Sequence, residues 1–344
     1  MSFSNPTPLH PHPDATRLTV THLSQTSPNP AQAGADVCEG LQQIPKTLPA
    51  KYFYDDRGSQ LFEQICDLPE YYPTRTEASI LQTAAPEIAN LTGNSELVEL
   101  GSGSSSKTRL LLDAYSQSLK DETASLIYRA IDVSGGILQE SAQRLLHDYP
   151  QLRVQGLVGT YEQALDHLPA TEADSRLLLF LGSTLGNLKP QACQQFLQRV
   201  SQALHPGEYF LLGVDLVKPK PILEAAYNDA QGVTAEFNLN MLAHLNRRFE
   251  GNFKLPQFEH WAFFNEKESQ IEMHLRSTVS QSATLRQLNL TLDFAAGETI
   301  QTEISRKFKH SDIVETLNSV KLETLHTWHD PQNWFAVVLA RRRP

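Results

Sequence analysis

This sequence of 344 residues has few cysteines, no excess of basic charge and no long apolar run. There are only three cysteines, and their spacing fits no zinc pattern, so we expect reduced thiols in a cytoplasmic protein rather than disulfides or a metal site. No run of about 18 apolar residues occurs, so no segment is expected to span a membrane. The net charge of −10 argues against a nucleic-acid or anionic-membrane partner, because both require clustered lysine and arginine.

The first 33 residues have few apolar side chains and are rich in Pro, Ser, Thr and Asn. We therefore expect a flexible arm there, and the absence of a basic flank before an apolar stretch argues against a secretory signal. The rest of the chain has an ordinary share of apolar residues and is long enough for two domains, or for one large domain with an insertion.

Strands and helices alternate through the middle of the chain. Apolar runs predict strands at 96–100, 125–131, 153–158, 176–181 and 208–214. Helical spacing predicts helices between them at 106–119, 136–149, 161–167 and 190–204. This alternation predicts an α/β fold, a mostly parallel sheet with helices on both faces.

Two helices are predicted before this region, and after it strands and helices no longer alternate. Asp56 or Ser59 is the expected cap of the first helix, and the second is expected at 74–89 with a capping box in its opening Thr-Arg-Thr-Glu. After Asp215 the chain becomes rich in helix and then in strand, and it closes with a helix and two strands joined by a turn at 330–333.

The turn after the first predicted strand of the alternating region consists of Gly-Ser-Gly-Ser-Ser-Ser, residues 101–106, and leads into a helix. Such a turn leaves the backbone bare for a ligand. The spacing does not fit a P-loop, and Ser106 stands where the dinucleotide fingerprint has its third glycine. The turn alone is compatible with a dinucleotide, with S-adenosylmethionine, or with a tight turn that binds nothing.

Asp132, at the end of the second strand, is suited to accept hydrogen bonds from the ribose of either cofactor, and the alternative is that it caps the next helix. The closing helix and hairpin resemble those of class I methyltransferases, whose last strand runs antiparallel to the others. This resemblance favours S-adenosylmethionine over a nicotinamide cofactor, and hence a methyltransferase over an oxidoreductase.

Five segments in order, at 51–77, 99–114, 180–188, 227–242 and 302–308, resemble the histidine-specific Nα-methyltransferases of ergothioneine biosynthesis. The resemblance implies transfer of three methyl groups from S-adenosylmethionine to the α-amine of L-histidine, giving hercynine, with no metal. Related enzymes methylate tryptophan derivatives, so another aromatic amino acid is the alternative substrate.

The resemblance also implies the architecture. A Rossmann-like class I methyltransferase domain with a seven-stranded, mostly parallel sheet is expected from residues 76–216 and 307–344. A second, substrate-binding domain is expected from residues 34–75 and 217–306. The expected partner is a small amino acid, with no nucleic acid and no membrane, and the enzyme is expected to be a monomer.

By resemblance, eight residues bind the substrate and none is assigned as a catalytic base. They are Tyr54, Tyr71, Gly182, Asn187, Tyr227, Met273, Glu303 and Ser305. Tyr54 is expected near the amine, and Asn187, with Gly182 nearby, and Tyr227 are expected at the carboxylate. Glu303 with Ser305 is expected at the imidazole N–H and Tyr71 at the other ring nitrogen, while Met273 is expected in the pocket wall. A structural reading is open for four of them: a helix cap or turn residue for Asn187, a half-buried aromatic for Tyr227, a core side chain for Met273, and an exposed salt bridge for Glu303.

The resemblance assigns the cofactor to seven further residues. They are Gly101, Ser102, Gly103, Lys107, Asp132, Thr160 and Tyr161. Lys107 is expected to hold the methionyl carboxylate. Many relatives carry an acid at the position of Thr160, so here backbone groups of Thr160 or Tyr161 are expected to contact the adenine.

Overall fold

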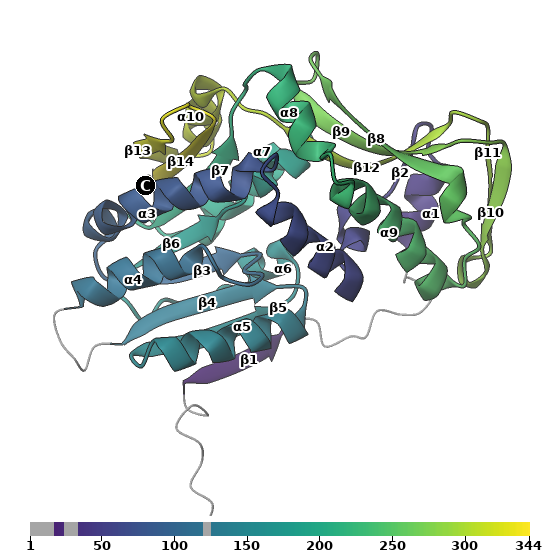
Figure 1. The fold of residues 1–344 in the computed structure, drawn as a ribbon. Helices are drawn as coiled ribbons and strands as arrows, with labels where there is room; N and C mark the ends of the chain where they lie inside the picture. The colour runs from purple at the N-terminus through teal and green to yellow at the C-terminus, as the bar shows by residue number, and fades with distance from the viewer. Residues whose placement is uncertain (1–16, 24–33, 120–124) are drawn as a thin grey trace, which may run out of the picture.

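The computed structural model describes residues 17–23, 34–119 and 125–344. Its largest sheet has eight strands (Figure 1). In spatial order they are β1 (Leu18–His22), β5 (Leu152–Val158), β4 (Leu126–Asp132), β3 (Ser95–Leu100), β6 (Ser175–Phe180), β7 (Tyr209–Asp215), β14 (Phe335–Arg342) and β13 (Leu322–His329). Only β14 runs antiparallel to the others, as the resemblance predicted for the last strand.

The expected seven strands become eight because β1 joins the edge of the sheet. It pairs in parallel with β5, from Leu18 opposite Val154 to His22 opposite Val158. The prediction of a flexible arm is therefore wrong for residues 18–22, and the remainder of that arm lies outside the described residues. The strand was missed because five alternating residues inside a long polar segment hardly change its average composition.

Helices cover both faces of this sheet, as the alternation predicted. One face is covered by α3 (Tyr72–Thr92), α4 (Thr108–Ser118) and α5 (Gly135–Asp148), and the other by α6 (Tyr161–Asp166), α7 (Pro190–Ala203) and α10 (His310–Ser319). Neighbouring strand residues serve opposite faces, since Leu97 packs into the first core and Val98 into the second.

A second part of the molecule is built from segments far apart in the sequence. Its sheet consists of β2 (Lys46–Thr47), β12 (Thr299–Arg306), β9 (Gln270–Ser277) and β8 (Phe258–Asn265). It also contains the hairpin β10 (Gln281–Leu285) and β11 (Leu290–Phe294), and the helices α1 (Ala35–Gln42), α2 (Asp56–Asp67), α8 (Lys220–Tyr227) and α9 (Val233–Phe249). Short 3-10 helices are η2 (Ala50–Phe53), η3 (Thr184–Asn187), η4 (Leu255–Gln257) and η5 (Arg286–Leu288).

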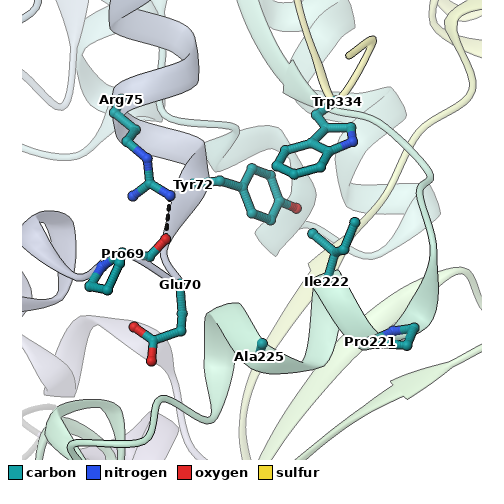
Figure 2. Close-up of a pocket in the computed structure, with 8 residues that line it drawn as sticks. All are labelled: Pro69, Glu70, Tyr72, Arg75, Pro221, Ile222, Ala225 and Trp334. Atoms are coloured by element: carbon teal, nitrogen blue, oxygen red, sulfur yellow. Dashed lines mark hydrogen bonds between the residues drawn. The ribbon is translucent and has the colours of Figure 1, made fainter.

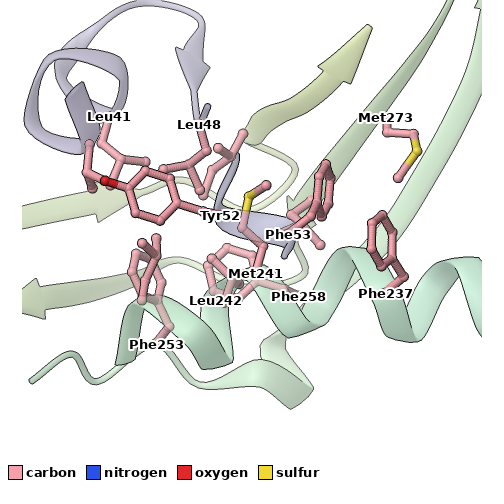
Figure 3. Close-up of a cluster of buried hydrophobic side chains, with 14 of the residues drawn as sticks. Leu41, Leu48, Tyr52, Phe53, Phe237, Met241, Leu242, Phe253, Phe258 and Met273 are labelled. Atoms are coloured by element: carbon pink, nitrogen blue, oxygen red, sulfur yellow. The ribbon is translucent and has the colours of Figure 1, made fainter. Parts of the chain in front are cut away.

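One apolar core joins these distant segments (Figure 3). Tyr52 and Phe53 enter it from η2, while Phe237 and Met241 enter it from α9. The rings of Phe53 and Phe237 are stacked with centroids 4.4 Å apart. The two segments that were expected to form a substrate domain therefore pack on each other, while the exact domain boundaries stay a prediction.

Two helix starts differ from the prediction. Asp55, not Asp56 or Ser59, caps α2 by accepting a hydrogen bond from the Gly58 N–H at 2.8 Å. Helix α3 begins at Tyr72 with a proline in its first turn, so the expected capping box does not form. The reason is that Thr74, the expected cap, lies inside the helix rather than at its start, and Glu77 accepts the Gly182 N–H instead.

The order of the strands decides where a ligand can bind. β3 lies between β4 and β6, so the chain's winding reverses direction at β3. Loops leaving the carboxyl ends of strands on either side of such a reversal diverge and leave room for a ligand. The glycine turn follows β3, and Gly182 and Asn187 follow β6, so both predicted sets of residues start from this point. Within the described part of the chain, no helix has the length and apolarity needed to cross a bilayer.

Candidate active site

The glycine turn after β3 has a backbone shape that depends on glycine at its first position. Gly101 has φ +75° and donates its N–H to the Ile131 carbonyl at 2.8 Å. A Cβ at Gly101 would lie 2.7 Å from the Tyr161 hydroxyl, which is closer than real Cβ contacts. A Cβ at Gly103 would meet no described atom within 4 Å, so the backbone is bare on that side. The turn can therefore approach a ligand closely.

Asp132 ties the turn to the end of β4. Its carboxylate accepts hydrogen bonds from the N–H groups of Gly103, at 3.0 Å, and Ser134, at 2.9 Å. Ser134, not Asp132, is the N-cap of α5, so the capping alternative is wrong. A carboxylate has about four acceptor positions, and those left over can take two hydroxyls of a ribose.

The remaining cofactor residues surround the same turn. The hydroxyl of Ser102 is buried and has no hydrogen-bond partner among the described residues, so a polar ligand atom could satisfy it. Thr160 uses its hydroxyl to cap α6 in a capping box with Gln163, which leaves only backbone groups for an adenine. The ring of Tyr161 packs edge-on against Phe180 at 5.4 Å. These groups fit S-adenosylmethionine: bare backbone, a free hydroxyl, an acid and a cation.

The cation, Lys107, forms an ion pair with Glu77, a residue that sequence reasoning had assigned to a helix cap. Glu77 is fully buried and also accepts the Gly182 N–H, at 2.9 Å from each carboxylate oxygen. Gly213 in β7 leaves space for it, since a Cβ there would lie 1.8 Å from Glu77 Oε1. Gly182 was predicted to contact the substrate, and its N–H is instead bound to Glu77, the partner of Lys107. No local signal could have identified Glu77, because all its partners are distant in sequence.

Four of the predicted substrate residues form two hydrogen-bonded pairs. Asn187 donates through Nδ2 to Glu303 Oε1 at 2.9 Å and to the Ile304 carbonyl at 2.8 Å. The Tyr227 hydroxyl donates to Ser305 Oγ at 2.8 Å. Glu303 and Ser305 belong to β12 and are two residues apart, so they lie on the same face of that strand, as predicted.

Three further predicted residues lie around these pairs. The ring of Tyr71 is 6.0 Å from that of Tyr227. Met273 is buried in the apolar core and pairs in register with Glu303, so it is a core side chain adjacent to the site. Tyr54 is 50% exposed, yet the pKa of its hydroxyl is raised by desolvation and also by the carboxylates of Glu303 and Asp132. Tyr54 is therefore within electrostatic reach of both the substrate set and the cofactor set.

The environment of Glu303 is unusual for a carboxylate. Burial raises its pKa to about 7, although the hydrogen bond from Asn187 and the charge of Lys307 both act to lower it. No salt bridge to Glu303 is present in the described structure, so the surface salt-bridge reading is wrong. Because the pKa of this carboxyl group is near neutrality, a ligand N–H that donates to it would stabilise its charged form.

A buried charge network, which sequence reasoning missed, lies behind the substrate pairs. Lys307 donates to Asp215 Oδ2 at 2.8 Å, to Tyr227 at 3.0 Å and to Ser305 at 2.7 Å. Lys218 contacts the same aspartate at 2.5 Å, and burial lowers the pKa of this lysine to about 8. Asp215 ends β7, so the network connects the large sheet to the strand that carries Glu303 and Ser305.

A pocket of about 330 Å³ adjoins this network through Tyr72, which is one of its lining residues (Figure 2). The ring of Tyr72 contributes to its wall, with Trp334 edge-on at 5.3 Å, and the Tyr72 hydroxyl donates to Asp215 at 2.7 Å. None of the fifteen predicted substrate and cofactor residues lines this pocket, so it is separate from the candidate active site.

The order of the strands, the antiparallel β14 inserted before β13, the bare glycine turn and the acid at the end of β4 together define a class I S-adenosylmethionine-dependent methyltransferase. The chain belongs to the family described as histidine-specific methyltransferase, SAM-dependent, whose model matches residues 33–342. This membership decides between the two cofactors that the glycine turn left open, in favour of S-adenosylmethionine.

Individual relatives are similar over most of the chain. The chain is 46% identical to the histidine N-alpha-methyltransferase of Mycolicibacterium smegmatis, over 89% of this chain and 94% of that protein. It is 36% identical to ergothioneine biosynthesis protein 1 of Neurospora crassa, over 59% of this chain and 23% of that protein. It is 29% identical to the 4-dimethylallyltryptophan N-methyltransferase of Aspergillus fumigatus, over 86% of this chain and 89% of that protein.

Proposed function

We propose that this enzyme transfers three methyl groups in turn from S-adenosylmethionine to the α-amine of L-histidine, giving hercynine, the first step of ergothioneine biosynthesis. The family description and the name of the Mycolicibacterium smegmatis relative support the reaction, and the name of the Neurospora crassa relative supports the pathway. Action in the cytoplasm and as a monomer stays a prediction from the sequence.

The observation that carries the proposal is the pairing of Asn187 with Glu303 and of Tyr227 with Ser305. The partners within each pair are more than 70 residues apart in the sequence. Asn187 follows β6, the strand that pairs with β3, so the pairs lie at the same edge of the large sheet as the glycine turn. Together they offer a ligand the Asn187 amide oxygen, the Ser305 hydroxyl proton and the Glu303 carboxylate, which are groups that can hold an amino acid with a five-membered nitrogen ring.

S-adenosylmethionine supplies an activated methyl group, and the protein's contribution is alignment, which in favourable cases is worth up to about 7–11 kcal/mol. Asp132 and Lys107 would hold the cofactor. Asn187 would orient the substrate's amine through its amide oxygen, because its amide protons go to Glu303 and the Ile304 carbonyl and the Tyr227 proton goes to Ser305. The amine must be neutral to attack. Tyr54 keeps its own proton because its pKa is raised, so it can orient the amine as a donor or acceptor but is not a base at neutral pH.

The test is mass spectrometry of L-histidine incubated with enzyme and S-adenosylmethionine. Products with one, two and three added methyl groups are expected in sequence. The variant Asn187→Ala should slow the reaction strongly, while Asn318→Ala, at an exposed asparagine of α10, serves as the control. Absence of any methylated histidine from active, folded enzyme would contradict the proposal.

A tryptophan derivative is the second candidate substrate, because one relative is named as a methyltransferase of 4-dimethylallyltryptophan. L-Tryptophan and 4-dimethylallyltryptophan are therefore assayed beside L-histidine. Higher kcat/KM for either indole substrate would make this candidate the better one. We expect histidine to be preferred, since Met273 and the Glu303 pairing leave an indole less well accommodated than an imidazole.

A further inference from the structure

Lys307 uses every hydrogen-bond donor of its ammonium group inside the protein. Its side chain is fully buried, and its three contacts are with Asp215, Tyr227 and Ser305. Burial acts to lower the pKa of Lys307, but the neighbouring Asp215 outweighs it and raises that pKa above the ordinary value. The group therefore stays charged, and an ammonium can only donate.

This arrangement determines the direction of the neighbouring hydrogen bonds. Tyr227 accepts from Lys307, and burial raises the pKa of its hydroxyl, so it keeps one proton, which it donates to Ser305. The oxygen of Ser305 then accepts from both Lys307 and Tyr227, which fills its two lone pairs. Its own proton must point elsewhere, and no atom of the described residues accepts it.

Ser305 shares a face of β12 with Glu303, two residues earlier. One carboxylate oxygen of Glu303 accepts from Asn187, and the other accepts no hydrogen bond from the described residues. The pair therefore offers a ligand one forced donor and one acceptor. A neutral imidazole has one N–H and one bare nitrogen, which is the complementary set.

We propose that Lys307 is a positioning residue that forces Ser305 to donate, so that the site selects a ring with one N–H and one bare nitrogen, the neutral imidazole. The inference rests on the proposed function, because the ring is that of the histidine substrate. A ring with an N–H but no bare nitrogen leaves the Ser305 proton unpaired. An imidazolium, with two N–H groups, meets Ser305 donor to donor.

The test compares kcat/KM for L-histidine with that for a pyrrolylalanine, in which the ring keeps its N–H and has C–H in place of the bare nitrogen. For the wild-type enzyme we expect a preference for histidine of about tenfold or more, because a buried donor is left unpaired with the analogue. In Lys307→Met, Ser305 is free to rotate and accept, so the preference should fall to within about threefold, mainly through KM.

The matched control is Lys218→Met. Lys218 is bound to the same Asp215 and to Tyr72, but it contacts neither Tyr227 nor Ser305. This variant should keep the wild-type preference even if it is less stable. Calorimetric binding of S-adenosylhomocysteine to each variant shows whether it is folded.

A wild-type enzyme that accepts both rings equally would overturn the proposal without any variant, even if Lys307→Met cannot be purified. An unchanged preference in folded Lys307→Met, or an equal loss in Lys218→Met, would also overturn it. Failure of the proposed function is distinguishable from these results, because the wild-type enzyme would then not methylate histidine at all.

Discussion

Two glutamates, Glu77 and Glu303, show how differently one side chain is used within the site. Glu77 is fully buried, but it has a cation, Lys107, and the Gly182 N–H as partners. Glu303 has one amide donor and no direct cation, and its pKa is raised to about 7. The first carboxylate is satisfied by the protein, whereas the second has capacity left for a ligand N–H.

Replacing Glu303 by alanine should raise KM for histidine by about 10–100-fold, because the ring N–H loses its acceptor in a partly buried site. kcat should change less, since the amine is held by other groups. The measurement is steady-state kinetics of methyl transfer, with Glu298→Gln, just before the same strand, as the control. Unchanged turnover at low histidine would refute this role for Glu303.

The raised pKa of Glu303 also predicts a pH dependence of stability. Between its ordinary value of 4.5 and about 7 the folded protein binds a proton there that the unfolded chain has lost, so the free energy of unfolding falls as pH rises through this window. Glu303→Gln lacks the titration. The variant should therefore gain stability relative to wild type from pH 5 to pH 8, by at most about 3 kcal/mol. Denaturant unfolding at both pH values measures this, and parallel changes in the two proteins would contradict it.

At the scale of elements, the strand–turn–helix unit of β3 and α4 was readable from the sequence, because a buried apolar run ends abruptly in glycine and serine. The five middle strands lie within one or two residues of their predicted bounds for the same reason. The start of α3 was not predictable. The sequence suggested a local capping role for Glu77, but its partners are distant in the sequence: Lys107, just after the glycine turn, and Gly182, after β6.

Gly101→Ala should weaken the binding of S-adenosylhomocysteine by about tenfold or more, which corresponds to about 1.4 kcal/mol. The alanine would be strained at φ +75° and would push the Tyr161 hydroxyl away from the turn. Calorimetry measures the affinity.

The control for this variant is Gly207→Ala. Gly207 has φ +96°, with no described atom within 4 Å of a Cβ, and it lies in the turn before β7, away from the cofactor residues. It should lose about 1 kcal/mol of stability and keep its affinity for the ligand. Equal losses of affinity in both variants would show that backbone strain, not the site, is responsible.

At the scale of the whole molecule, the large sheet and the second part meet at the substrate residues. Asn187 from the loop after β6 contacts β12, and Asp215 at the end of β7 contacts Lys307 just beyond β12. The network therefore holds the strand that carries Glu303 and Ser305 against the cofactor-binding sheet.

Asp215→Asn should lower the free energy of unfolding by about 3–5 kcal/mol, because it leaves two buried ammonium groups, Lys218 and Lys307, without their common counter-charge. Asp166→Asn is the control, since it breaks an ion pair with Arg199 that is largely exposed, and should change stability by less than about 1 kcal/mol. Thermal or denaturant unfolding compares them. Similar small effects in both would mean that the network contributes little to holding the two parts together.

The sequence by itself determined the parallel sheet, the glycine turn at its centre, the antiparallel closing strand and the candidate positions Asn187, Tyr227, Glu303 and Ser305. The sheet and the turn follow from local apolar periodicity and short motifs, which act within a few neighbouring residues, whereas the direction of the closing strand and the four positions follow from the resemblance to a known family. Only the tertiary structure decided which groups face one another: Asn187 with Glu303, 116 residues apart, Lys107 with Glu77, and Lys307 with Asp215. Burial and charge pairing depend on distances in space, and folding alone brings such residues together.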